Sequence, residues 1–176
     1  MGRGSGGASL LVASRGVSVV AVGAASHMVA RTHERAAQAG VEVDARVMDG
    51  TALDVADAAF DVALSVFGVV LFPDAIAGMT ELRRVVRPGG RVAVVTWTGP
   101  QHDELATMLR QAVQSVWPEQ PAVPLPAQLR YREEADFRAL FAAAGLADFD
   151  IVSGASPSRR GWRPSSAVWV SAATRS

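Results

Sequence analysis

Two short motifs in the first fifty residues carry groups that could hold a ligand. The glycine-rich segment Gly2-Arg3-Gly4-Ser5-Gly6-Gly7 fits both a GxGxG and a GxGxxG pattern, and Asp49-Gly50 places a carboxylate beside a glycine. Glycines let the backbone approach a ligand closely, and a helix that begins after them points its amides at that ligand. Each motif also has a simpler explanation, because chain termini are often disordered and a turn aspartate can bond its own backbone.

The histidines are the candidate bases. His27, His33 and His102 are too far apart in sequence to predict a metal site, since one metal needs three or four convergent ligands. His33 lies on a charged helix face, where a solvated ring is expected. His102 follows a predicted strand and could accept a proton from a bound reactant, although loop histidines are usually solvated. No Gly-x-Ser-x-Gly elbow is present, which argues against a serine hydrolase.

A strand, a helix and a second strand between residues 60 and 97 organise the chain. The apolar run 60–67 predicts a buried strand, and Asp74 can cap a helix whose apolar residues recur at helical spacing. Pro88-Gly89-Gly90 ends that helix, and 91–97 is a second buried strand. The order predicts one right-handed βαβ unit with parallel strands. Its arginines, Arg83, Arg84, Arg87 and Arg91, are interpreted as a solvent-facing helix side and turn.

The remaining segments extend the same alternation. Before residue 60 we predict, in order, a helix at 8–14, a strand at 17–22, a helix at 26–39, a strand at 41–48 and a loop at 53–59. After residue 97 we predict helices at 103–117 and 133–144 and a strand at 149–152. Segment 165–174 permits a strand, but the start at Pro164-Ser165 favours a helix, which we predict. The pattern indicates an α/β doubly wound fold.

Composition narrows the class of protein. The chain has 176 residues, 49% of them hydrophobic, which suits one folded domain. Seventeen basic residues balance seventeen acidic ones without a basic block, which argues against a nucleic-acid partner. There is no cysteine, no apolar run approaching the ~20 residues that cross a bilayer, and no signal-peptide layout. A cytoplasmic protein that does not engage a membrane is therefore expected.

Four segments together resemble the class I S-adenosylmethionine-dependent methyltransferases, of the broad ubiquinone/menaquinone-biosynthesis-like "type 11" kind. They are GRGSGGASLL, VSVVAVGAASHMVARTHERAA, VMDGTALDVADAAFDVALSVFG and LRRVVRPGGRVAVVTW, and YREEADFRALFAAAGLADFDIV resembles the late helix and sixth strand of that fold. The resemblance implies a Rossmann-like, mostly parallel sheet in a single domain over 1–176. Residues 1–97 would form the cofactor-binding half and 98–176 the acceptor side.

The resemblance also implies roles for single residues. The glycine turn would lie against the methionine part of S-adenosylmethionine, and Met28 would pack on the adenine. Asp49 would accept a hydrogen bond from the adenine amino group, with Gly50 beside it. Asp61, at the start of its strand, matches an acid that is more often structural. The implied cofactor-binding residues are Gly2, Gly4, Ser5, Gly6, Gly23, Met28, Asp49, Gly50, Val66 and Phe67, the last two also bordering the acceptor pocket.

The sequence departs from the family pattern at three places. Gly23 stands where an acid usually binds the ribose hydroxyls, a loss worth ~1–3 kcal/mol of hydrogen bonding. Met1 falls inside the glycine motif, so the first, central strand is expected to be missing. Its absence would leave ladder groups unpaired or force the flanking strands together. The chain also is expected to stop before a seventh strand. These departures predict a fragment, a misassigned start or a decaying copy.

Three functions are compatible with these residues. The first is methyl transfer from S-adenosylmethionine to a small-molecule oxygen, nitrogen or carbon, which needs positioning more than a dedicated catalytic group. The second is a nicotinamide-binding protein that uses Gly2, Gly4 and Gly7. The third is a non-catalytic methyltransferase remnant. The loops at 99–130 and 153–164 are expected to choose the acceptor, and the sequence predicts neither the acceptor nor the oligomeric state.

Overall fold

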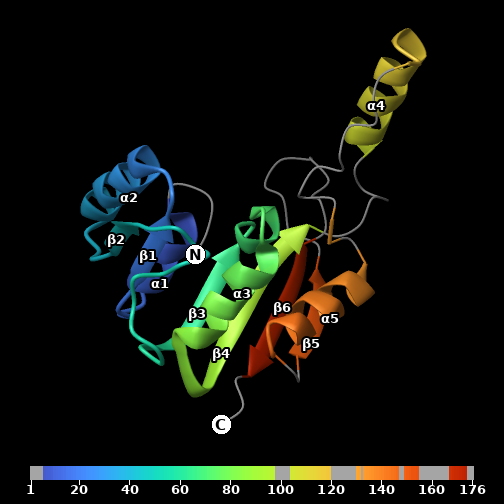
Figure 1. The fold of residues 1–176 in the computed structure, drawn as a ribbon. Coiled ribbons are helices and arrows are strands. Elements are labelled where there is room, and N and C mark those ends of the chain that lie inside the picture. The colour runs from blue at the N-terminus through green and yellow to red at the C-terminus, as the bar shows by residue number, and fades with distance from the viewer. Residues whose placement is uncertain are drawn as a thin grey trace.

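A computed structural model describes residues 6–97, 104–119, 130–131, 133–146, 149–154 and 167–173 (Figure 1). These residues form the alternation of helices and strands that the sequence predicts. In chain order the elements are α1 (Gly7–Ala13), β1 (Val20–Gly23), α2 (Ser26–Ala39), β2 (Asp44–Val47), β3 (Phe60–Val66), the 3₁₀ helix η1 (Val69–Leu71), α3 (Ala75–Arg84), β4 (Val86–Trp97), α4 (Glu104–Val116), α5 (Glu134–Ala143), β5 (Phe149–Gly154) and β6 (Ala167–Ala173).

The described strands form two separate sheets. β1 and β2 are parallel and make a two-stranded sheet, while the larger sheet has the order β3-β4-β6-β5. β3 and β4 are parallel, and β6 runs antiparallel to both of its neighbours. The fold is therefore α/β and Rossmann-like, as predicted. The sheet divides between β1 and β3, where the central strand was expected to be missing, and these two strands are not forced together.

The helix predicted at residues 165–174 is wrong. Residues Ala167–Ala173 form β6, which pairs with β4 from Arg91↔Ala173 to Trp97↔Ala167 and with β5 on its other side. The β-branched residues of Val168-Trp169-Val170 fit a strand flanked on both sides, and this long-range pairing overrides the local helix signal at Pro164-Ser165. The expectation that the chain stops before a seventh strand of the family fold is also wrong, because β6 follows β5 in the chain and pairs between β4 and β5.

The βαβ unit β3–α3–β4 follows its predicted local signals. The Asp74 carboxylate accepts a hydrogen bond from the Ala77 amide at 2.9 Å and caps α3. The helix ends at Arg84, before Pro88-Gly89-Gly90, so the prediction that these residues end it is wrong; they lie within β4. The chain returns through a bulge, because the register shifts between the pairs Phe60↔Val86 and Val62↔Arg91. A side chain at Gly90 would put its Cβ 2.5 Å from the Asp61 carbonyl oxygen, so this return requires glycine.

Two hydrophobic clusters of unequal size hold the fold together. The larger one lies between the four-stranded sheet and the neighbouring helices α3 and α5 (Figure 1). Its fully buried side chains include Met79, Leu82, Phe137, Phe141 and Leu146. The smaller cluster, under α2, has only Ala36, Val43 and Ala45 as buried members. The β1–β2 half therefore buries much less apolar surface than the half built on β3–β6.

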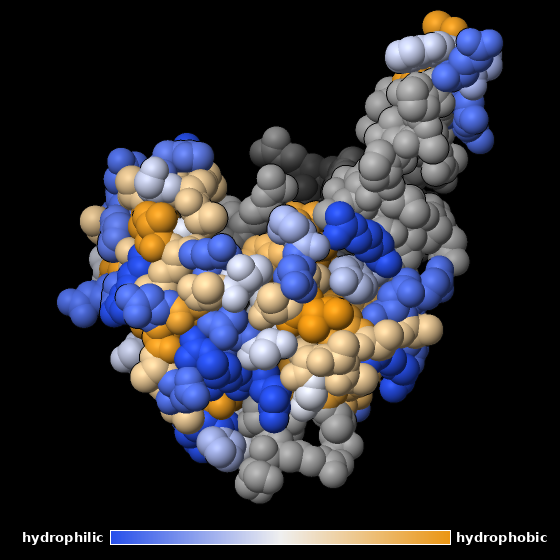
Figure 2. Space-filling model, viewed as in Figure 1, coloured by the Kyte–Doolittle hydropathy of each residue, from blue (hydrophilic) through white to orange (hydrophobic). Residues whose placement is uncertain are grey.

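Helix α4 forms where predicted, but Met108 and Val116, two of its predicted inward residues, are exposed. Met108 is 65% exposed and Val116 is 86% exposed. The helix projects from the rest of the molecule, and apolar surface is visible at its tip (Figures 1 and 2). Within the described ranges, no helix has both the length and the apolar character needed to cross a bilayer.

The unequal clusters predict unequal protection against amide exchange. In hydrogen-exchange mass spectrometry at neutral pH, we expect amides of β1 and β2 to exchange about tenfold or more faster than those of β3 and β4. Local opening of the smaller half, which contains β1 and β2, costs less free energy than opening of the larger half. Both pairs of strands are parallel and belong to the same protein, so β3 and β4 serve as the internal reference. Equal protection in the two pairs would contradict this account.

Candidate active site

Residues that end β1 and β2 meet at one edge of the two-stranded sheet. The strands are in parallel register from Val20↔Asp44 to Gly23↔Val47, and the Met48 amide donates to the Gly23 carbonyl at 3.2 Å. Asp49 follows directly, so its turn lies beside the carboxyl end of β1. Ligands of open α/β sheets bind beyond these strand ends.

Asp49 forms a tight turn with one of its two carboxylate oxygens. Oδ1 accepts from the Thr51 amide and from the Thr51 hydroxyl, each at 2.8 Å. These two bonds lower the pKa of Asp49, which keeps the exposed side chain charged at neutral pH. The simpler interpretation, a turn aspartate bonding its own backbone, is therefore confirmed for Oδ1. No hydrogen bond within the described part of the chain engages Oδ2, so that oxygen can accept from a ligand. Gly50 is buried beside it.

The described end of the glycine segment contacts α2, the helix that follows β1. Gly6, with φ +78°, precedes α1, and a Cβ on it would lie 2.6 Å from Thr32 Cγ2. The buried Thr32 hydroxyl donates to the Met28 carbonyl at 2.9 Å. The start of α1 therefore rests against the first two turns of α2, the helix that follows β1. Gly2, Gly4 and Ser5, the other predicted members of the motif, lie outside the described residues.

The end of β1 is open where the family pattern has an acid. A Cβ on Gly23 would meet only Val29 Cγ2, at 3.9 Å. Met28 is half-buried in the first turn of α2, and the helix begins at Ala25 without a side-chain cap. A side chain at position 23 would therefore meet no close neighbour, but glycine itself supplies no partner for a ribose.

The backbone that leaves β3 is strained. Phe67 has φ +53°, a left-handed conformation that costs a residue with a side chain on the order of 1–3 kcal/mol. Its amide donates to the Val95 carbonyl at 2.8 Å, and the neighbouring buried Ser65 hydroxyl accepts from the Val69 amide at 2.9 Å. These bonds hold the turn in place. Val66 and Phe67 are both half-buried.

The other candidate residues have structural roles or lie apart. Asp61 pairs with Arg87 at 2.5 Å on the surface, consistent with the structural role expected for it. His33 Nε2 lies 2.9 Å from the Ala45 carbonyl oxygen, so this ring contacts β2 as well as solvent. His27 is exposed, and His102 lies outside the described residues. Among the residues with defined positions, no three His, Asp or Glu side chains converge as a metal site would require.

Sequence reasoning missed the most extensively bonded side chain of this region. Arg84 was interpreted as solvent-facing, but its side chain is only 28% exposed and bonds to Glu81, Asp57 and two carbonyl groups of the loop between β2 and β3. The sequence did contain one signal: Glu81 and Arg84 are three residues apart on a helix, a spacing that allows an ion pair. Nothing in it indicated the loop as their common partner.

Known proteins with similar sequences identify the family of this chain. A family model described as a methyltransferase domain matches residues 1–90, just over half of the chain. An uncharacterised Mycobacterium tuberculosis protein is 39% identical over 95 residues, which cover 54% of this chain and 35% of that protein. A demethylmenaquinone methyltransferase of a Mycobacterium species is 36% identical over 70 residues, 40% of this chain and 30% of the relative. The chain thus spans about a third of the length of these curated relatives.

A solved structure supports the same assignment at the level of the fold. An S-adenosylmethionine-dependent methyltransferase from Methanosarcina mazei superposes with a TM-score of 0.76 at 20% identity, over 99% of this chain and 91% of that one. The family match adds methyltransferase chemistry, for which the sequence resemblance implies S-adenosylmethionine as the cofactor. The described residues fit its adenosine end, since Asp49 Oδ2 is available, Met28 is half-buried and the nearest atom to a Cβ on Gly23 would be Val29 Cγ2 at 3.9 Å. The chain belongs to the methyltransferase-domain family.

Proposed function

We propose that this chain binds S-adenosylmethionine across the carboxyl ends of β1 and β2 and transfers its methyl group to a small-molecule nucleophile. One observation carries the proposal. Asp49 lies beside Gly23 at the end of β1, and the described end of the glycine segment contacts Thr32 on α2, the helix that follows β1. A single extended ligand would span from one place to the other.

The side chains at this edge can bind and orient, which is what the reaction requires of them. The Asp49 carboxylate, charged at neutral pH, would accept from the adenine amino group through Oδ2, while Oδ1 stays bonded to Thr51. Met28 would pack against the ring. The bound cofactor supplies an activated methyl group. The chain has then to hold that methyl in line with the acceptor and to exclude water.

Fewer observed contacts support the acceptor side of the proposed site than support the cofactor side. Val66 and Phe67, half-buried where β3 ends, would border the acceptor's site. The nucleophile would be an oxygen, nitrogen or carbon of a small molecule, and it would be selected by the segments 99–130, which include α4, and 153–164. The demethylmenaquinone methyltransferase among the relatives is consistent with a small-molecule acceptor.

The proposal predicts selective stabilisation by a cofactor product. At a concentration of S-adenosylhomocysteine about 100 times its Kd, binding adds about 2.7 kcal/mol to the free energy of unfolding. For a chain of this length we expect a rise in Tm of about 5–10 °C. NADH at the same concentration is the control and should leave Tm unchanged. Stabilisation by NADH, or by neither compound, would overturn the proposal.

Asp49→Asn tests the residue on which the adenine contact depends. Asparagine keeps an acceptor for Thr51 but presents an NH₂ group where Oδ2 stood, so it cannot accept from the adenine amino group. We expect Kd for S-adenosylhomocysteine, measured by calorimetry, to rise about 10- to 100-fold, and Tm of the free protein to change little. Asp61→Asn, which removes another exposed carboxylate, should bind normally. A Kd for Asp49→Asn within twofold of the wild-type value would remove Asp49 from the site.

A further inference from the structure

We propose that Glu81 and Arg84 are positioning residues for the cofactor site. They hold the loop between β2 and β3, residues 48–59, in the conformation that presents Asp49 to the ligand. Neither residue would touch the cofactor. The inference rests on the proposed function, because it assigns the loop's rigidity to binding at Asp49.

Arg84 uses every hydrogen-bond donor it has. Nε and Nη2 donate to the two oxygens of Glu81, both at 2.7 Å, in a bidentate pair. Nη1 donates to the Val55 carbonyl at 2.7 Å and to Asp57 Oδ1 at 2.6 Å, and Nη2 also donates to the Leu53 carbonyl at 2.9 Å. All five N–H donors of the guanidinium are thus engaged, three of them by the loop. A lysine could not reproduce this arrangement, since its ammonium group has three donors and no planar fork.

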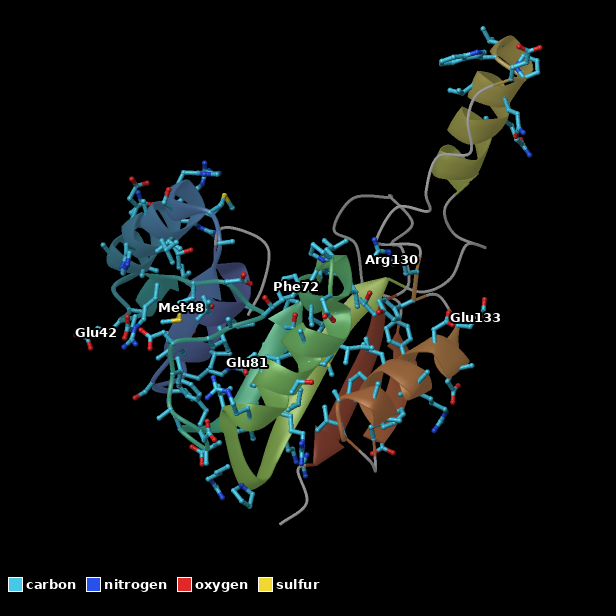
Figure 3. All side chains as sticks on the ribbon, in the orientation of Figure 1. Glu42, Met48, Phe72, Glu81, Arg130 and Glu133 are labelled. Atoms are coloured by element: carbon cyan, nitrogen blue, oxygen red, sulfur yellow. The ribbon has the colours of Figure 1, made fainter. Side chains whose placement is uncertain are left out.

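Glu81 completes the contact from the other side of Leu53. Its Oε2 accepts from the Leu53 amide at 2.7 Å, so the main-chain N–H and C=O of Leu53 are both bonded to this pair of side chains. The Arg84 guanidinium lowers the pKa of Glu81, which therefore stays ionised at neutral pH. Figure 3 shows Glu81 on the side of α3 toward the end of β2, where Met48 lies.

Main-chain bonds and packing reinforce the same attachment. The Ala58 amide donates to the Arg84 carbonyl and the Phe60 amide to the Val85 carbonyl, each at 3.0 Å. Leu53 and Val55 pack against the larger hydrophobic cluster. The second half of the loop is therefore fixed to the end of α3 by side chains, by backbone and by apolar contact.

This attachment lies only a few residues from Asp49 in the sequence. The Ala52 amide donates to the Asp49 carbonyl at 3.2 Å, which closes the turn that begins at Asp49, and Leu53 is the next residue. One end of the turn is thus held by β2 and the other by Glu81 and Arg84. Because the Glu81–Arg84 pair belongs to the larger half of the fold, it also fixes Asp49 relative to Val66 and Phe67, which border the proposed acceptor site.

The experiment compares Glu81→Gln, Arg84→Lys and Glu134→Gln with the wild type at a temperature where all four proteins are fully folded. Glu134 pairs with Arg138 on the exposed face of α5, so its variant loses an ion pair far along the chain from the loop. We measure Kd for S-adenosylhomocysteine by calorimetry and amide exchange of residues 50–58 without ligand.

For Glu81→Gln and Arg84→Lys we expect faster exchange in residues 50–58 and unchanged exchange in β4 and α5. If the competent turn falls to about a tenth of the population, Kd rises about tenfold. Glu134→Gln should match the wild type in both measurements. A mere loss of stability would lower Tm without changing Kd for the folded protein.

Two results would overturn the positioning role alone. One is wild-type exchange of residues 50–58 in both loop variants, and the other is faster exchange with a Kd within twofold of the wild-type value. Wild-type protein that binds no S-adenosylhomocysteine would instead overturn the proposed function, and the positioning role with it.

Discussion

The attachment of the loop at 48–59 to the end of α3 is the constraint on which the rest of this structure depends. β1 and β2 form their own small sheet, and the described strands β1 and β3 are not paired. The smaller half therefore lacks the continuous ladder that would fix it to the larger one. Leu53 and Val55, partly buried against the larger cluster and bonded to Glu81 and Arg84, provide that connection. The half-buried ion pair between Glu81 and Arg84 contributes here because the main chain that it holds satisfies its polar atoms.

This arrangement connects the unequal stability of the two halves of the fold with the proposed cofactor site. The proposed cofactor residues lie mainly on the half that buries little apolar surface, where Ala36, Val43 and Ala45 form the buried cluster. Such a half is expected to open locally more often than the half that contains Phe137 and Phe141. A ligand that contacts both the start of α2 and the Asp49 turn would stabilise this half, so binding and local folding should be coupled. The position of Gly23, which offers the ribose no carboxylate, makes the remaining contacts more important.

The sequence predicted the features that are encoded locally. The Asp74 cap, the end of α2 at Gly40 and the inward Phe137, Leu140 and Phe141 follow from capping and periodicity, and each is observed. The order of elements and the turn at Asp49 were predictable for the same reason. Each of these signals lies within a few residues of the structure it specifies.

The features that sequence reasoning missed depend on contacts between distant segments. Residues 167–173 become a strand because β4 and β5 flank them, which a local helix signal cannot reveal. Arg84 becomes the centre of a network because a loop about thirty residues earlier folds against it, as the Leu53 carbonyl bond shows. Periodicity identified the apolar side of α4, but it could not show that Met108 and Val116 stay exposed.

The central claim is that a nucleoside lies between Met28 and Asp49 at the end of β1. Intermolecular nuclear Overhauser effects test it most directly, with methyl-labelled methionine and S-adenosylhomocysteine bound to the wild-type protein. The account predicts contacts from the adenine ring protons to the Met28 methyl group and none to that of Met79, which is fully buried in the larger cluster. Bound ligand whose adenine protons show no contact with Met28 would contradict it.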